Sequence, residues 1–402
     1  MRQKIQLFTL FATILADFTG FSLVIAIFPA IIMHNTPAFL AHGATLFTKS
    51  LTLGLLTSSY PAAQFFGAPL FGSLSDQWGR KKMMQVTLIG SALSYLVTAL
   101  AMTSCSLILL FASRIAAGLF AGNLTLAQAA IGDLSTNATR TRNFAYVSMA
   151  GSLAFIMGPA LGGRLADAFS ITTPFLVACA LFVAVLLVFS WVFDETICHG
   201  KREDKISILQ GFRHIGTIKD LPRLHWPLAS FFVIRTGYWM FMLFFSAYLV
   251  TKFQFSRTQA ADTYIMLAIW STVMVNTIVR WLSKLQRNFM LILLTTFTIA
   301  ATVLIISLSS TASLIYAMLP LFAFAITGFY TYFMSFLSKE AAENQGVAMG
   351  IATSLQSVAQ VIAPLIAGMI MATHPNLPLL LSAFLTFIGG FLMIKKSRHR
   401  ML

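Results

Sequence analysis

The chain has 402 residues, of which 58% are hydrophobic and only 10% are charged, whereas about 25% of the residues in a soluble domain carry a charge. This composition excludes an ordinary soluble protein and predicts one that crosses a lipid bilayer several times. The net charge of +15 does not require a nucleic-acid partner, because membrane proteins concentrate Lys and Arg in their cytoplasmic loops. The three cysteines lack the spacing of a metal site, so we expect no metal or other cofactor.

Apolar runs of about 20 residues, the length of a membrane-spanning helix, recur along the whole chain. The first run begins at Ile5 and is too long for the apolar core of a signal peptide, so we interpret it as a retained helix. The predicted spans cover residues 5–31, 50–71, 83–103, 107–131, 144–166, 173–193, 226–250, 258–280, 289–308, 312–336, 345–371 and 377–394. We therefore expect an all-α membrane protein with twelve transmembrane helices.

The positions of Lys and Arg predict the orientation of these spans. With the N-terminus in the cytoplasm, most of the 27 Lys and Arg residues fall in cytoplasmic segments, as the positive-inside rule requires. The outer face then keeps only Lys49, Arg164, Lys252 and Arg257. Because the number of spans is even, the short basic C-terminal tail is also expected in the cytoplasm.

A long polar interval at residues 194–225 separates six predicted spans from six. We interpret it as a cytoplasmic linker between an N-terminal bundle (1–193) and a C-terminal bundle (226–402). The two halves resemble each other weakly, since GPALGG at 158–163 has a counterpart in APLIAG at 363–368. Repeated halves with Pro- and Gly-interrupted helices in matching places indicate a secondary transporter with a site between its halves.

A charged, glycine-bearing stretch at residues 72–82 lies between the second and third predicted spans and reads GSLSDQWGRKK. Its two glycines, Gly72 and Gly79, permit close backbone approach and tight turns. Asp76 precedes the basic residues Arg80 and Lys81, so the stretch can latch helix ends together by opposite charge. The simpler alternative is a positively charged cytoplasmic turn.

Two ionisable residues lie deep within predicted spans. Asp17 is about 18 Å along the first span from its cytoplasmic end, and Arg114 in the 107–131 span is about 20 Å from that face. Ionisable groups at this depth are costly, so a functional or paired role is the default. A conformational change that altered the distance between them would move a proton on or off Asp17. The alternative is a static buried pair that holds the two helices together.

The stretch at 72–82, Arg114 with the small residues after it, and the glycines and proline of the 144–166 span resemble motifs of the major facilitator superfamily. The resemblance is to its drug/proton antiporter branch with twelve helices, which includes bacterial tetracycline and multidrug resistance exporters. It implies two six-helix bundles, proton coupling through Asp17 and Arg114, and a gate at the signature loop. It also implies a hinge that favours export, at Gly151, Gly158, Pro159, Gly162 and Gly163. Helix packing alone is the alternative reading of these glycines.

The chain departs from the tetracycline exporters in two places. Where they carry an acid in the third helix, this chain has Ser94 beside Tyr95, and the 289–308 span has no acid either. Tetracycline is therefore not the expected substrate. Arg235 is an added cation within a span, which could contact an anionic or carboxylate-bearing substrate, form a structural pair, or snorkel to the membrane surface.

Polar and aromatic residues inside the spans are candidates for lining a substrate cavity, because a mixed wall of this kind can bind amphipathic molecules. They are Gln64, Asn123, Gln128, Arg235, Tyr238, Trp239, Asn276, Tyr330, Tyr332, Gln356 and Gln360.

These patterns predict a secondary transporter that exports amphipathic small molecules in exchange for protons, by alternating access. A carrier of one metabolite, such as a siderophore-like anion, is the alternative. A transporter-like sensor would tolerate loss of the signature loop, which this chain retains, and an enzyme would need clustered catalytic side chains that the spans lack. The expected partners are the substrate, protons and the lipid bilayer, with no nucleic acid. We expect a monomer in the bacterial inner membrane, driven by the proton gradient.

Overall fold

The computed structural model describes residues 2–35, 38–136, 139–195, 221–285, 287–341 and 345–398, and these residues form helices and connecting turns with no strand. Most of the predicted linker lies outside the described residues. The predicted all-α fold is confirmed.

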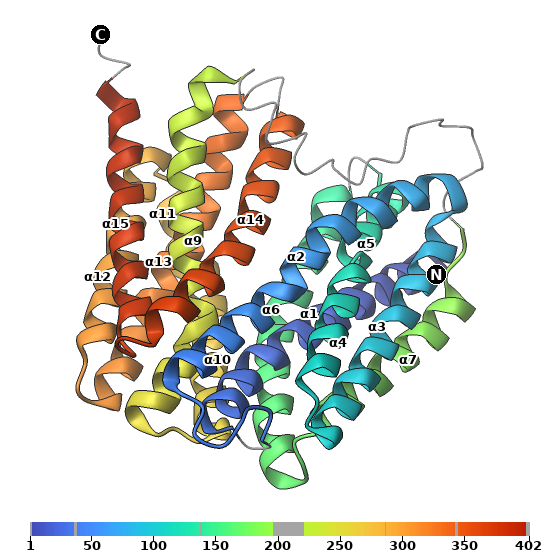
Figure 1. The fold of residues 1–402 in the computed structure, drawn as a ribbon. Helices are drawn as coiled ribbons and strands as arrows, with labels where there is room; N and C mark the ends of the chain where they lie inside the picture. Colours follow the sequence, from blue (N-terminus) through green and yellow to red (C-terminus); the bar gives the residue numbers. More distant parts are fainter. Residues whose placement is uncertain are drawn as a thin grey trace. The chain divides into compact units, whose positions relative to one another are not determined.

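Each predicted span of the first half corresponds to helical structure (Figure 1). The helices are α1 (Arg2–His34), α2 (Leu46–Trp78), α3 (Arg80–Ser104), α4 (Leu107–Leu119), α5 (Asn123–Leu134), α6 (Arg140–Ala168) and α7 (Thr173–Val192). The span predicted at 107–131 is broken into α4 and α5. The chain tightens there because the amide of Ala121 donates to the carbonyl of Gly118, at 3.1 Å, only three residues back.

The second half begins with a short 3₁₀ turn, η2 (Pro222–Leu224), that leads into α9. It continues through α9 (His225–Phe253), α10 (Arg257–Met274), η3 (Val275–Val279), α11 (Arg280–Ser283), α12 (Asn288–Leu308), α13 (Ala312–Ala341), α14 (Gln345–Met371) and α15 (Leu377–Arg398). The segment η3 is a π-helical turn that joins α10 to α11, so the three together form the span predicted at 258–280.

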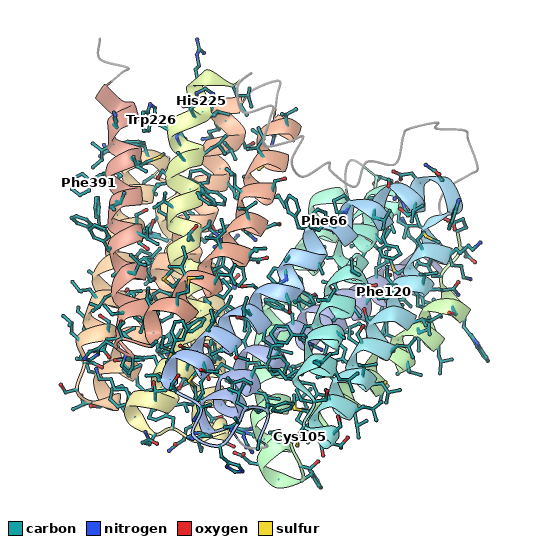
Figure 2. The ribbon with its side chains drawn as sticks, in the orientation of Figure 1. Phe66, Cys105, Phe120, His225, Trp226 and Phe391 are labelled. Carbon is teal, nitrogen blue, oxygen red and sulfur yellow. The ribbon has the colours of Figure 1, made fainter. Side chains whose placement is uncertain are left out.

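Within the described ranges, ten helical segments are long and apolar enough to cross a membrane. The two predicted spans outside this set are α2 and α6, in which prolines, glycines and polar residues lower the mean hydropathy. Apolar side chains also remain exposed on the outside of the helices, among them Trp226 on α9 and Phe391 on α15 (Figure 2). An apolar outer surface is typical of helices that face lipid.

The chain divides into two compact units. The first comprises Met1–His42, Ser59–Gln210 and Arg257–Asp262, and the second comprises Gly43–Ser58, Gly211–Ser256 and Thr263–Leu402. In the first unit α1 packs on α6 and α7, and α3 packs on α7 and α4. In the second unit α9 packs on α14 and α15, and α12 packs on α15 and α13. The two units thus repeat one packing pattern, in which α9 holds the place of α1.

A glycine sets the distance between α1 and α6. A Cβ atom added at Gly158 would lie 1.9 Å from Ser22 Oγ and 2.8 Å from the carbonyl oxygen of Thr19. The two backbones approach this closely because Gly158 has no side chain. The hydroxyl of Ser22 also donates to the carbonyl of Ala154, at 2.8 Å. This contact holds the middle of α1, and with it Asp17, against the rest of the first unit.

Candidate functional site

Asp17 lies in the middle of α1 and is only 8% exposed. Its carboxylate accepts a hydrogen bond from Nδ2 of Asn123, at 3.0 Å, from the first turn of α5. The same Nδ2 lies 3.3 Å from Oγ of Ser91 on α3, so one amide group joins three helices. The structure therefore gives Asn123, which the sequence suggested only as a cavity residue, a direct contact with the predicted coupling acid.

Arg114 on α4 is 2% exposed and is surrounded by neutral groups. Its Nη2 donates to the hydroxyl of Thr98, and its guanidinium carbon lies 5.5 Å from the ring centre of Phe28 and 5.2 Å from that of Tyr95. No ion pair joins Asp17 to Arg114 among the residues that the structure describes. An interaction between the two, direct or through water, stays a prediction.

Arg114 and Asn123 each have a buried polar atom with no hydrogen-bond partner in the described part of the chain. The atoms are Nε of Arg114 and Oδ1 of Asn123. A buried polar atom without a partner costs about 1–3 kcal/mol, and such atoms in a native structure call for an explanation. Tyr60, also buried, packs beside this region against Phe21, with 5.4 Å between ring centres. The region therefore has spare hydrogen-bonding capacity around a buried acid and a buried base.

Ser91 and Thr98 were not predicted as partners of these residues. A signal for them is present, because the buried polar residues Thr87, Ser91, Ser94 and Thr98 recur every three or four residues along α3. This spacing places them on one face of a helix. A polar stripe on an otherwise apolar span predicts a face that meets other polar groups.

The second unit contains a different buried charge, Arg235 on α9, which is 6% exposed. Its guanidinium carbon lies 4.3 Å from the ring centre of Tyr238, 5.5 Å from that of Trp239 and 5.6 Å from that of Tyr330. The first two rings come from α9 and the third comes from α13. Four residues from the predicted cavity set are thus brought together in one cluster.

The remaining cavity candidates do not join one described cluster. The side-chain amide of Gln64 donates to the carbonyl of Ala121, at 3.4 Å, and that of Asn276 donates to the carbonyl of Thr272, at 2.8 Å. Tyr332 is buried, and its hydroxyl donates to the carbonyl of Val279 in the π-helical turn, at 3.0 Å. The other three candidates are half-buried: Gln128, Gln356 and Gln360.

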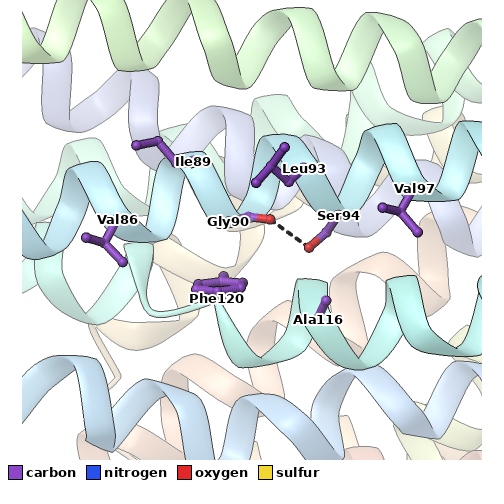
Figure 3. Close-up of a pocket in the computed structure, with 8 residues that line it drawn as sticks. All are labelled: Val86, Ile89, Gly90, Leu93, Ser94, Val97, Ala116 and Phe120. Atoms are coloured by element: carbon purple, nitrogen blue, oxygen red, sulfur yellow. Dashed lines mark hydrogen bonds between the residues drawn. The ribbon is translucent and has the colours of Figure 1, made fainter.

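A groove on the first unit contains none of these candidates. It is lined by apolar side chains of α3 and α4 together with Phe120, which packs on Gly90 (Figure 3). The hydroxyl of Ser94, the polar residue that lines it, donates a hydrogen bond to the carbonyl of Gly90, at 2.7 Å. No group of three or more His, Cys, Asp or Glu within the described ranges could hold a metal ion.

The signature stretch differs in shape from the expected loop. Helix α2 continues through Asp76 to Trp78, and α3 begins at Arg80, so Gly79 alone lies between them. Gly79 has φ 96°, a backbone conformation that residues with a side chain rarely adopt, and this lets the chain turn within one residue. The prediction of a loop across 72–82 is therefore wrong, because one glycine suffices for the turn.

Arg80 joins several helix ends at this turn. Its guanidinium lies 2.7 Å from the carboxylate of Asp76 at the end of α2 and 3.4 Å from that of Asp133 on α5. Glu195 was not among the predicted site residues. Its carboxylate accepts hydrogen bonds from the backbone amides of Arg80 and Lys81, at 2.8 and 3.1 Å. A carboxylate is favourable at a helix N-terminus. The available signal was the acidic pair, Asp194 and Glu195, that ends a long apolar run.

The predicted hinge residues lie on α6. Besides Gly158, a Cβ atom at Gly162 would lie 3.2 Å from the side chain of Ile27 on α1, and one at Gly163 would lie 2.6 Å from Cβ of Ala261 on α10. A Cβ atom at Gly151 would meet nothing closer than 3.7 Å. Pro159 lies inside the helix, which continues through it. The last three glycines of the motif thus serve close packing, and Gly151 has space around it.

Comparison with known proteins places this architecture in a family. Residues 9–364 match the Major Facilitator Superfamily. The chain is 27% identical over 374 residues to mouse major facilitator superfamily domain-containing protein 10, covering 86% of this chain and 78% of that protein. It is 24% identical over 404 residues to the quinolone resistance protein NorA of Staphylococcus aureus, covering 98% of this chain and 97% of NorA.

Solved structures show the same fold. The human organic anion transporter MFSD10 superposes with a TM-score of 0.72 at 20% identity, covering 97% of this chain and 99% of that one. The nucleoside transporter NupG superposes with a TM-score of 0.76 at 14% identity, covering 96% and 99% of the two chains. Because the family match extends over most of its length, this protein belongs to the Major Facilitator Superfamily and is a multi-pass membrane transporter, not an enzyme.

Proposed function

We propose that the protein is a proton-coupled secondary transporter that exports amphipathic small molecules, with Asp17 as its protonation site. The observation that carries this proposal is the buried position of Asp17 in the middle of α1, where its hydrogen-bond partner is the neutral amide of Asn123. An acid at this depth in a membrane is costly and is retained for a function or a charged partner. A group that alternately binds and releases a proton meets this requirement.

Arg114 acts in this proposal as the group that sets the charge balance around Asp17. In the described conformation its partners are Thr98 and aromatic rings rather than the acid. In the opposite conformation of the transport cycle the guanidinium approaches the carboxylate and displaces its proton. The unpartnered Nε of Arg114 is available for that contact.

The gate and the direction of transport complete the proposal. The contacts of Arg80 with Asp76 and Asp133 form a latch of helix ends that opens and closes with the cycle. Export is favoured by the resemblance of the glycine-rich stretch of α6 to the hinge of drug/proton antiporters, and by the similarity to a quinolone resistance protein.

A second candidate function is the transport of one class of anionic metabolite. Arg235 favours it, because this buried cation has no acidic partner among the described residues. The similarity to a protein described as an organic anion transporter points the same way. Proton coupling through Asp17 serves either candidate.

The setting in the membrane belongs to the same proposal. We place both termini in the cytoplasm, assign residues 194–225 to a linker between the bundles 1–193 and 226–402, and expect a monomer in a bacterial inner membrane. The distribution of Lys and Arg supports the orientation.

The test is proton movement in inside-out vesicles that respiration has energised, screened against a panel of cationic, neutral and anionic amphipathic compounds. We expect one class of compound to collapse the pH gradient with the wild-type protein but not with Asp17→Asn. Asp204→Asn, which removes an acid from the polar linker, is the matched control and should behave as wild type. Equal collapse with the wild-type protein and Asp17→Asn would refute the assignment of Asp17.

A further inference from the structure

Helix α9 is rich in aromatic residues, and Arg235 lies among them along the helix. Phe231 stacks on Phe333 of α13, with 4.6 Å between ring centres, and Phe241 packs on Phe322 of α13, at 4.5 Å. Arg235 falls between these two contacts along the helix. At this level of the helix, the rings near the guanidinium are two from α9 and one, Tyr330, from α13.

The surroundings of Arg235 satisfy its charge poorly. Tyr238, Trp239 and Tyr330 all lie within cation–π range, with Tyr238 nearest at 4.3 Å. Its Nε is buried and has no hydrogen-bond partner, and no acid in the described ranges forms an ion pair with it. Rings stabilise the face of a guanidinium, whereas its N–H donors need acceptors in the plane of the group.

The position of Arg235 along α9 argues against snorkelling. The residue lies ten positions after His225, the start of the helix, which corresponds to about 15 Å at the usual rise per residue. That is half the thickness of a hydrocarbon core of about 30 Å, too deep for the side chain to reach the membrane surface. A cation held there without an anion is unfavourable, and no acid of the described ranges supplies that anion.

We propose that Arg235, with the rings of Tyr238, Trp239 and Tyr330, forms the binding site for an organic anion that carries a carboxylate or sulfonate beside a flat apolar ring. The inference rests on the proposed transport function and names its substrate class. The N–H donors of the guanidinium match the two oxygens of such a group, and the aromatic side chains suit its ring. Tyr330 is 43% exposed, so the cluster reaches the surface of the second unit at this ring.

The experiment measures equilibrium binding to the full-length protein in nanodiscs of phosphatidylcholine, with no proton gradient present. The probes are 2-naphthoate and its neutral analogue 2-naphthamide, which differ in charge but share the ring. We expect 2-naphthoate to bind at least about ten-fold more tightly, because the amide leaves the guanidinium without an anionic partner. Trp239 lies 5.5 Å from the guanidinium, so quenching that is lost in Trp239→Phe would locate the probe at this site.

Variants decide between this site and binding elsewhere. Arg235→Gln should lower the affinity for 2-naphthoate by about ten-fold, so that both probes bind equally well. Arg235→Lys should retain part of the preference for 2-naphthoate over 2-naphthamide. Arg280→Gln, which removes an exposed arginine of the same unit, should change neither affinity. If Arg235→Gln fails to fold, Tyr330→Leu replaces it and should weaken both probes.

Three results would overturn the inference. They are equal binding of the two probes to the wild-type protein, unchanged 2-naphthoate affinity in folded Arg235→Gln, and equally strong competition by chloride or phosphate, which would make this an inorganic anion site. Because binding is measured without a gradient, the result is separate from the vesicle test of proton coupling. Failure of either experiment leaves the other interpretable.

Discussion

Helices α1 and α9 hold corresponding places in the two units, and each carries a buried charged side chain. The charges have opposite sign and different surroundings. Asp17 on α1 accepts a hydrogen bond from a buried amide, and hydroxyl-bearing residues of α3 lie close by. Arg235 on α9 is enclosed by aromatic rings that accept no hydrogen bond in the plane of the guanidinium.

Under the proposed function, this difference corresponds to a division of roles between two repeats of one architecture. A polar network can stabilise either charge state of an acid, because amides and hydroxyls both donate and accept hydrogen bonds. An aromatic cage around a permanent cation lacks this flexibility and favours an anion that arrives with an apolar ring. We therefore propose that proton exchange belongs to the first unit and substrate recognition to the second.

The largest effect is expected from neutralising the two charges in turn. Asp17→Asn should reduce substrate-driven proton movement to the level of empty vesicles for every substrate, because no titrating group remains at the site. Arg235→Gln should reduce it about ten-fold for anionic substrates below saturation, in line with the expected loss of affinity, and retain it for neutral ones. Fluorescence of a pH-sensitive dye inside the vesicles measures both. If the two variants showed the same substrate profile, the division of labour would be contradicted.

Adding a side chain at the contact between α1 and α6 should destabilise the protein without touching either charge. Gly158→Ala places a methyl group 1.9 Å from Ser22 Oγ, and overpacking of this kind costs about 1–3 kcal/mol. Gly151→Ala on the same helix, where the nearest atom is 3.7 Å away, should change stability by less than about 0.5 kcal/mol. Thermal unfolding in detergent compares them, and equal losses would mean that this close contact does not hold α1.

Removing the amide that contacts Asp17 should have an intermediate effect. Asn123→Leu deletes the 3.0 Å hydrogen bond to a carboxylate, a bond worth about 1.5–3 kcal/mol, and should alter the pH profile of transport. Thr125→Val, an exposed position on the same helix, serves as control and should leave the profile unchanged. An unaltered profile in folded Asn123→Leu would separate Asn123 from the coupling site.

The smallest effect concerns the π-helical turn of the second unit. Tyr332→Phe removes the hydroxyl that donates to the carbonyl of Val279, which should cost about 1 kcal/mol of stability and leave transport intact. The half-buried Tyr316 provides the matched variant Tyr316→Phe, with an expected loss below about 0.5 kcal/mol. A transport defect in Tyr332→Phe would instead assign this turn a part in the cycle.

Much of the fold could be predicted from the sequence, because apolar runs of membrane-spanning length are a strong local signal. Asp17, Arg114 and Arg235 stood out for the same reason, as charges inside apolar runs. Their partners did not stand out, because Asn123 and Ser91 meet Asp17 only through the packing of α1, α3 and α5.

The features that were predicted wrongly or not at all also depend on tertiary structure. The extension of α2 through Asp76 depends on a turn made by Gly79 alone, and the role of Glu195 depends on its meeting a helix end more than a hundred residues earlier. The break between α4 and α5 lies in an apolar stretch with no proline, so hydropathy did not reveal it. Local sequence patterns carry no information about contacts between residues that are distant in sequence.

The most direct test of the central claim is proton release by the purified protein when substrate binds in a weakly buffered solution. We predict that the wild-type protein releases about one proton per bound substrate over the pH range in which Asp17 titrates. We expect Asp17→Asn to bind substrate and release no proton. Undiminished release from Asp17→Asn would show that another group carries the proton and would contradict the account.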